Sequence, residues 1–348
     1  MFKTLRPTAM PLFQAFLACG LLVCSALALA APAKPPLDLL FRPESRLVLG
    51  TLVEKNPAGR LVFKREKVFD ASTDVPELID VRAGERELAE TELGRRYVLG
   101  YSLFHHDRQY PRGIAPNRKG AILISSAGLD PALFPQSTLI LQIVTEASRG
   151  EGRQSPAMKR LLMKAIKRDD ARLQLLAAGQ FAYKPALAEK LTAGDRQRLE
   201  RLARDPDSRV DVRAMLLAAA AEQPAAFGKW AGDEVRGILA STPLDGYSSE
   251  SGDPSGLVLL AFSEASLHHI PVPYDSIRRW LRSPQRSLIE KSTFLLGEQY
   301  PARQRDALGE ALGDSSISRD TRQILDDQLR FIDRQQQAAS ELQQQGPG

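Results

Sequence analysis

Five times in the C-terminal half of the chain, a short polar turn leads into an apolar run of helical character. The five units begin at Arg168, Arg204, Gly252, Ser283 and Gly313, so the steps between them are 36, 48, 31 and 30 residues. One helical pair of this length cannot bury its apolar face alone, whereas stacked pairs form a continuous core. The recurrence therefore predicts an α-helical repeat domain over residues 157–334.

The second unit, DPDSRVDVRAMLLAAAA, resembles a HEAT repeat. The resemblance rests on Asp205, Pro206, Val212, Arg213 and Ala214, and it implies a HEAT-like solenoid. It also implies that the aspartate caps a helix and that the arginine packs between neighbouring repeats. The other four units match more loosely, and the 48-residue step contains a stretch at 241–256 that is predicted to be a long loop.

Residues 46–145 carry short apolar runs separated by Gly, Pro and Asp, a texture typical of β-strands. The first run, RLVLGTLV from Arg46, is apolar on both faces, which suits a strand buried on both sides or curved into a barrel, and Gly50 would permit a bulge. Further strands are predicted at 61–69, 77–81, 95–103, 119–125 and 137–144. These runs predict a small all-β module.

The phrases LVLGTLVEK, GRLVFKREKVF and ELGRRYVLGYSL resemble the OB-like modules of secreted proteins, with Gly94, Tyr97, Val98 and Leu99 matching the last phrase. The resemblance implies an OB-like barrel and brings no catalytic residues. The expected fold class is thus α+β in separate domains: a small all-β, OB-like barrel followed by a HEAT-like α-helical repeat domain.

The N-terminus has the pattern of a secretory signal. Lys3 and Arg6 precede an apolar run at 11–30 that ends Ala-Leu-Ala, so residues 1–30 are predicted to be cleaved after Ala30. An uncleaved membrane anchor is the alternative, since the run is long enough to span a bilayer. We expect a periplasmic protein, or alternatively a secreted one, with no integral membrane segment in the mature chain. The remaining predicted segments are a Pro-rich lead at 31–45, a linker at 146–156 and a disordered tail at 335–348.

Both cysteines lie within the signal segment, so the mature chain is predicted to lack disulfides, a thiolate nucleophile and Cys-ligated zinc. The sequence motifs of common hydrolases are missing from it as well. All four histidines occur in two adjacent pairs, His105–His106, followed by Asp107, and His268–His269. A zinc site needs three or four convergent ligands, and we expect no metal and no cofactor. The rival hypothesis is an envelope hydrolase or metal-dependent enzyme that uses the turn at 105–107 or His269.

Charge is uneven along the chain. The net charge is +1 for residues 31–152, +7 for 153–213 and −5 for 214–348. The basic stretch at 153–213 would attract an anionic partner, but a solvated helix face is the simpler explanation. The candidate binding residues lie on a helix predicted from Pro156 and in the turn at 110–120: Lys159, Arg160, Lys164, Lys167, Arg168, Arg112, Arg118 and Lys119.

The favoured hypothesis is a non-enzymatic adaptor or scaffold that binds another envelope protein or peptide through its helical-repeat surface. An anionic envelope polymer or lipid is the alternative partner for the basic stretch. Nucleic acid is not expected, because the chain is predicted to be exported.

Overall fold

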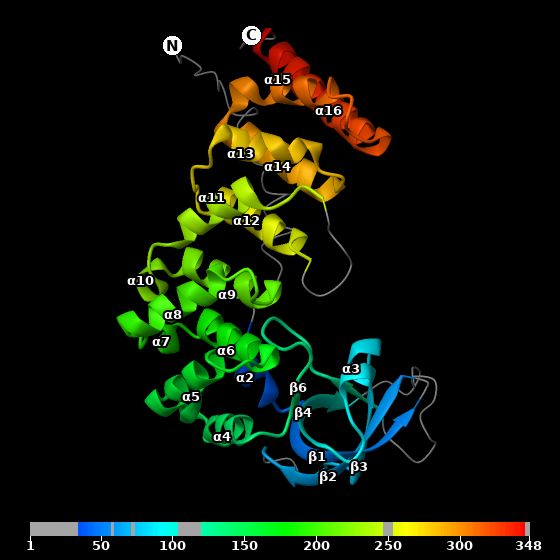
Figure 1. The fold of residues 1–348 in the computed structure, drawn as a ribbon, viewed down its shortest axis with the longest axis vertical. Coiled ribbons are helices and arrows are strands. Elements are labelled where there is room, and N and C mark those ends of the chain that lie inside the picture. The colour runs from blue at the N-terminus through cyan, green and yellow to red at the C-terminus, as the bar shows by residue number, and fades with distance from the viewer. Residues whose placement is uncertain (1–33, 57–58, 71–73, 104–119, 246–252, 345–348) are drawn as a thin grey trace, which may run out of the picture.

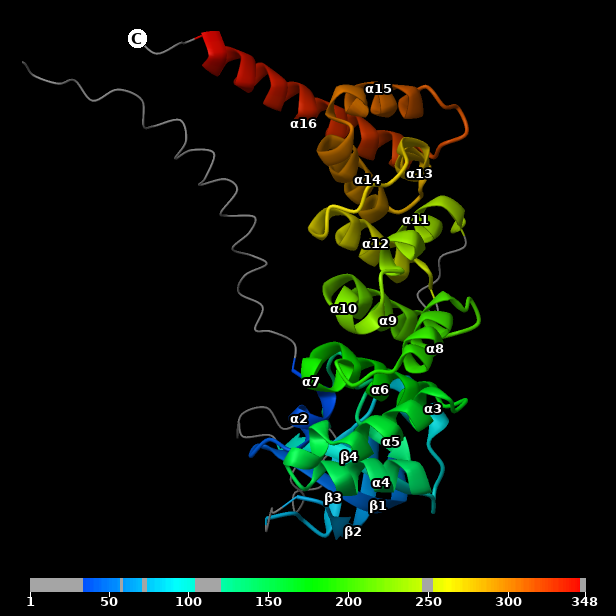
Figure 2. The same cartoon turned by 90° about the vertical axis from the view of Figure 1, so that its left-hand side faces the viewer.

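The computed structural model describes residues 34–56, 59–70, 74–103, 120–245 and 253–344, so the predicted signal segment lies outside the described residues. A small β-barrel lies at one end, and the helices stack away from it along the long axis of the molecule (Figures 1 and 2). Among the helices of the described ranges, none combines the length and apolar character needed to cross a membrane. The predicted fold class, α+β in separate parts, is confirmed.

Five strands of the described residues close the barrel, in the order β1-β2-β3-β5-β4, with β4 pairing back to β1. All these pairs are antiparallel except β3–β5, which is parallel, and β6 extends the sheet beside β4. The helix α3 (Glu85–Glu90) connects β3 to β4. The strands are β1 (Ser45–Asn56), β2 (Arg60–Val68), β3 (Leu78–Arg82), β4 (Arg96–Leu103), β5 (Gly120–Leu123) and β6 (Leu133–Pro135).

The two apolar faces of β1 serve two different cores. Val48 and Leu52 lie in the barrel interior, whereas Leu47 and Leu49 belong to the core shared with the helices. The register of β1 against β2 shifts at Gly50, where a Cβ atom would lie 3.1 Å from the carbonyl oxygen of Lys64. The predicted two-faced strand with a bulge at this glycine is therefore confirmed, and its outer face is buried because helices pack on it.

The helical region forms a stack of pairs. The second helices of the pairs, α6, α9, α12, α14 and α16, each contact the next along the stack. The five sequence units predicted as repeats lead into these five helices. The elements are α4 (Thr138–Ala147), η1 (Glu151–Gln154), α5 (Pro156–Ile166), α6 (Ala171–Tyr183), α7 (Pro185–Ala188), α8 (Ala193–Arg204), α9 (Val210–Glu222), α10 (Pro224–Phe227), α11 (Ala231–Ser241), α12 (Ser255–Leu267), α13 (Tyr274–Arg278), η2 (Arg279–Arg282), α14 (Arg286–Gln299), α15 (Pro301–Leu312) and α16 (Arg319–Gln344).

Three sequence predictions differ from the structure. The run at 137–144, predicted to be a strand, forms α4, because Ser137 caps it and its apolar residues recur at helical spacing. The tail predicted to be disordered from 335 is helical as far as Gln344, since α16 continues through it. Residues 146–156, predicted to be a linker, form the end of α4, the 3-10 turn η1 and the cap of α5.

The turn before α9 differs from what the repeat resemblance implies. The carboxylate of Asp205 accepts hydrogen bonds from the backbone nitrogen of Asp207 and the hydroxyl of Ser208, while the N-cap of α9 has no side-chain cap. Asp205 thus stabilises the loop between α8 and α9 and does not cap α9. Arg213 donates to the carbonyl oxygen of Ala203 at 3.0 Å and lies 3.7 Å from Glu234, so it ties α9 to both α8 and α11.

The short helix α2 (Pro36–Leu40) holds the barrel and the helices together. Leu37 and Leu40 are fully buried, and the backbone nitrogen of Leu37 donates to Oε1 of Gln180 in α6 at 3.0 Å. Asp38 forms ion pairs with Arg153 at 3.3 Å and with Lys184 at 2.8 Å. Because α2 joins β1 directly, these contacts fix the barrel against the first helical pairs.

A cluster of charged side chains adds a second connection between the two parts. Asp130, in the segment before β6, pairs with Arg86 of α3 at 2.9 Å and with Arg209 at the start of α9 at 2.7 Å. The hydrogen bond from Arg86, joined by that from Arg209, holds the pKa of Asp130 below its ordinary value despite partial burial.

The lowered pKa of Asp130 predicts an acid-sensitive contribution to stability. A carboxyl whose pKa is lower in the folded state stabilises that state above its unfolded pKa, and the stabilisation is lost as pH falls through the folded value. We expect the free energy of unfolding of the wild type to fall more steeply between roughly pH 5 and pH 2 than that of Asp130→Asn. Denaturant unfolding at a series of pH values measures this. Parallel curves for the two proteins would contradict it.

Candidate functional site

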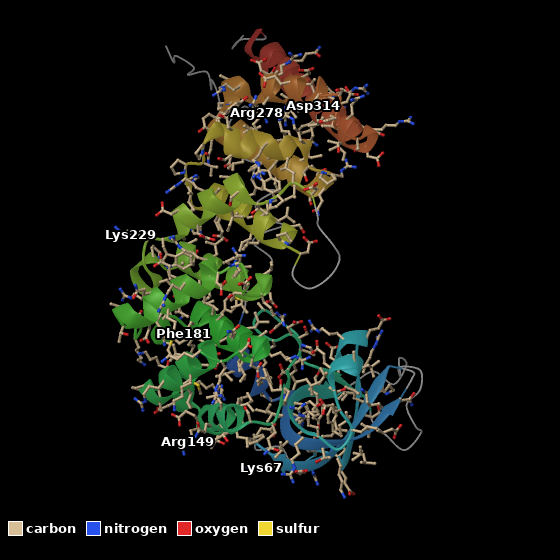
Figure 3. The ribbon with its side chains drawn as sticks, in the orientation of Figure 1. Lys67, Arg149, Phe181, Lys229, Arg278 and Asp314 are labelled. Carbon is tan, nitrogen blue, oxygen red and sulfur yellow. The ribbon has the colours of Figure 1, made fainter. Side chains whose placement is uncertain are left out.

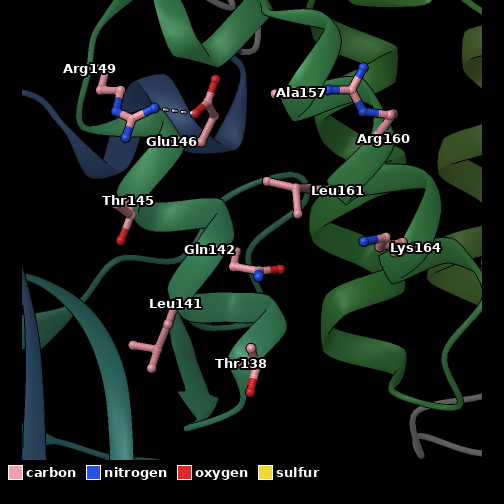
Figure 4. Close-up of a pocket in the computed structure, with 10 residues that line it drawn as sticks. All are labelled: Thr138, Leu141, Gln142, Thr145, Glu146, Arg149, Ala157, Arg160, Leu161 and Lys164. Atoms are coloured by element: carbon pink, nitrogen blue, oxygen red, sulfur yellow. Dashed lines mark hydrogen bonds and ion pairs between the residues drawn. The ribbon is translucent and has the colours of Figure 1, made fainter.

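The first two helices of the stack, α4 and α5, border an open groove of ≈ 530 Å³ at the barrel end of the helical region (Figure 4). The α4 wall is formed by Thr138, Leu141, Gln142, Thr145 and Glu146, with Arg149 just beyond the helix. The α5 wall is formed by Ala157, Arg160, Leu161 and Lys164. The groove therefore combines polar, cationic and apolar side chains from two neighbouring helices.

Helical spacing explains why α4 presents these residues. Its buried face carries Leu139, Ile140, Ile143 and Val144, which pack into the common core. The groove face consists of residues three, four and seven positions after Thr138, which form a separate stripe of the same helix. Leu141 is the apolar member of this stripe, and it is only half-buried.

The second wall follows from the way α5 begins and packs. Ser155 caps the helix by accepting a hydrogen bond from the backbone nitrogen of Met158 at 3.0 Å, and Pro156 occupies its first position, as predicted. Met158 and Leu162 are fully buried, whereas Leu161 is half-buried, packs partly against the core and lines the groove. Leu161 therefore belongs to the core with one side and to the groove with the other.

The five candidate cations on and after α5 have different environments. Lys159 is half-buried and lies 2.5 Å from Asp195 of α8, so it joins two helices. Arg160 and Lys164 line the groove, are exposed and have no ion-pair partner in the described part of the chain. Lys167 and Arg168 are likewise exposed and unpaired there, just beyond the helix. Positive charge without a counterion therefore gathers along this side of α5.

Much of the remaining basic stretch is neutralised within the protein. Ion pairs to carboxylates involve these side chains of the stretch 153–213: Arg153, Arg172, Lys184, Arg204, Arg209 and Arg213. Several of these pairs join the barrel or α2 to the helices, so they stabilise the junction. The net charge of the stretch thus overstates the charge that a partner would meet.

The one carboxylate in the groove already has partners. Glu146 lies 3.1 Å from Arg149 and accepts a hydrogen bond from the hydroxyl of Ser155 at 2.6 Å. Figure 4 shows Arg149 and Glu146 together at one end of the groove, away from Lys164. The cations of α5 are consequently not neutralised by this carboxylate.

The other predicted site residues lie elsewhere. Arg112, Arg118 and Lys119, and the turn His105, His106 and Asp107, fall outside the described residues. The described residues contain no group of three His, Cys, Asp or Glu side chains placed to hold a metal ion.

The second histidine pair follows α12. His268 lies 3.1 Å from Glu264, and burial raises the pKa of this carboxyl while the nearby histidine opposes the shift. His269 is exposed, has a φ of 50° and lines a second cavity of ≈ 500 Å³ with Ser266, Glu298 and Tyr300 among others. The two histidines thus face different surroundings, as adjacent residues at a helix end commonly do.

Sequence reasoning missed the α4 wall of the groove. Because the run at 137–144 was predicted to be a strand, Thr138, Leu141 and Gln142 were assigned to the β module. A signal for the helix exists in the sequence: Ser137 as N-cap, and apolar residues at positions 139, 140, 143, 144 and 147.

Comparison with known proteins adds no relative. No protein-family model matches the chain, and neither a curated protein nor a solved structure matches it.

Proposed function

We propose that this chain is an exported, periplasmic bacterial adaptor that binds another envelope protein through the α4/α5 groove and performs no reaction itself. The single observation that carries the proposal is a pair of half-exposed leucines, Leu141 and Leu161, which line the same groove from different helices. Apolar side chains within a polar rim are typical of surfaces that bind proteins. Export is supported by the signal pattern of residues 1–30.

The architecture supports a binding role in a second way. Both walls stand on helices whose opposite faces are buried, and α2 and the Asp130 cluster join the barrel to the neighbouring helices α6 and α9. A groove on such rigid elements needs little ordering when a partner binds, so less binding energy is lost.

The finer fold assignments belong to the same proposal. The barrel order β1-β2-β3-β5-β4 with its parallel β3–β5 pair and the intervening α3 supports an OB-like module. The ladder of second helices and the inter-repeat contacts of Arg213 support a HEAT-like solenoid. Helical solenoids present extended surfaces on which partners bind.

Site-specific photocrosslinking tests the proposal. Mature protein carrying a photoreactive amino acid in place of Leu161 is exposed to an envelope extract, and the crosslinked products are identified by mass spectrometry. We expect one protein to be crosslinked in preference to all others. The matched control carries the same group at Lys229, which is exposed and lies farther along the stack (Figure 3). A crosslinking pattern that is the same from both positions would contradict the proposal.

A further inference from the structure

We infer, on the basis of the proposed binding function, that the occupant of the α4/α5 groove is a short extended segment of the partner protein with acidic residues at alternate positions and an apolar residue between them. Charge complementarity supports this occupant. Arg160 and Lys164 project from the same side of α5, and neither has a counterion among the described residues (Figure 4). A ligand that supplies carboxylates neutralises them and gains charge-assisted hydrogen bonds.

The narrowness of the groove favours an extended chain over a helix as occupant. The groove has a volume of ≈ 530 Å³ and runs beside α4, a helix of 10 residues. A helix of that length extends about 15 Å, so the groove averages roughly 35 Å² in cross-section, against about 80 Å² for a helix 10 Å across. A single extended chain fits this width better, and about 15 Å corresponds to roughly five extended residues.

The spacing of the cations matches an extended chain. Arg160 and Lys164 are four residues apart on α5, which places them about 6 Å apart along the helix axis. In an extended segment, residues i and i+2 point to the same side and are separated by roughly 6.5–6.8 Å. Two acidic residues with one residue between them therefore meet the two cations in register.

The intervening residue of such a segment points to the opposite side, toward the α4 wall. That wall contains the half-buried Leu141, together with Gln142 and Thr145. An apolar side chain at this position covers apolar surface that solvent now contacts. A uniform polyanion, such as a polyphosphate or an acidic glycan, neutralises the cations but leaves this surface uncovered. The groove therefore favours an acidic peptide over an anionic polymer.

Fluorescence anisotropy with synthetic peptides tests the inference. The probe is a labelled seven-residue peptide with glutamates at alternate positions and leucine between two of them. The comparison peptide has the same composition with its glutamates contiguous. We expect mature wild-type protein to bind the alternating peptide at least about tenfold more tightly than the comparison peptide, and Lys164→Glu to weaken its binding by about tenfold or more.

Lys229→Glu is the matched control, because it reverses one exposed lysine that lies outside the groove and is also unpaired among the described residues. It should leave the affinity within about twofold of wild type and, like Lys164→Glu, leave the unfolding midpoint unchanged. Equal weakening by both variants would show nonspecific charge attraction and overturn the inference. Tighter binding of an inorganic polyphosphate chain than of the alternating peptide would also overturn it, as would a dimer of the protein that Lys164→Glu dissociates.

The peptide experiment tests the inferred occupant, and the crosslinking experiment tests the proposed adaptor function. If the alternating peptide does not bind but the groove still crosslinks one envelope protein preferentially, the inference about the occupant is wrong and the proposed adaptor function stands. If the peptide binds as expected but no protein is crosslinked, the groove chemistry is confirmed and the adaptor function is contradicted.

Discussion

Trp280→Ala is expected to lower the free energy of unfolding by about 3–5 kcal/mol, the typical cost of removing a large buried aromatic side chain. Trp280 in η2 is fully buried, and its Nε1 donates to the carbonyl oxygen of Leu239 at 2.8 Å. Its ring meets Phe262 of α12 edge-on at 6.2 Å. One side chain thus joins three neighbouring segments of the stack, and its removal leaves a cavity among them.

Two variants separate the causes of this effect. Trp280→Phe keeps an aromatic ring but removes the N–H donor, so it should cost less than Trp280→Ala while leaving the carbonyl of Leu239 without that partner. Phe294→Ala removes an aromatic side chain of α14 that is 58% exposed, and it should change stability by less than about 1 kcal/mol. Chemical denaturation followed by circular dichroism measures all three. Similar losses for Trp280→Ala and Phe294→Ala would contradict the assigned packing.

The second large effect is expected at the junction between barrel and helices. Gly179 of α6 packs so closely that an added Cβ would lie 2.8 Å from the Cα of Gly128 and 3.0 Å from Cγ of Pro36. Gly128, which has a φ of 88°, is itself closely packed, because a Cβ atom added to it would lie 2.5 Å from Cγ of Pro36. We expect Gly179→Ala to destabilise the protein by about 1–3 kcal/mol through overpacking.

The control for this prediction is Gly309→Ala. Gly309 lies within α15, and a Cβ atom there meets no other atom within 4 Å, so alanine should be neutral or stabilise by about 0.5–1 kcal/mol. Thermal unfolding measures both variants, and limited proteolysis reports whether the junction opens. If Gly179→Ala behaves like Gly309→Ala, the close packing of α2, α6 and the segment at Gly128 is not what joins the two parts.

The sequence was sufficient for the elements whose pattern is local. The strand pair at 46–69 was predictable because each run is bounded by turn residues, and the second helices of the stack were predictable because polar turns precede apolar stripes. The strand predicted at 137–144 is wrong because a short, nearly continuous apolar run suits a buried strand as well as a buried helix, and the helix signal given by Ser137 and the spacing of the apolar residues was outweighed.

The candidate site, too, was predictable only in part. The sequence located the cations of α5, since its helical period and charge can be read from adjacent residues. It could not show that Lys159 is paired and Lys164 is not. Asp195, which neutralises Lys159, lies on α8 and becomes a neighbour only when the helices stack. Nor could it show that Leu161 lines a groove, because that depends on where α4 packs.

Local sequence patterns thus predicted a β module followed by a helical region, with a basic helix near the start of that region. Tertiary packing shows which basic residues have no ion-pair partner in the described ranges, that two leucines share a groove, and that α2 fixes the barrel against the helices. The difference lies in how far apart in the chain the interacting residues are. Turn residues and apolar periodicity act between near neighbours, whereas ion pairing and burial depend on residues that are distant in the chain and adjacent only after folding.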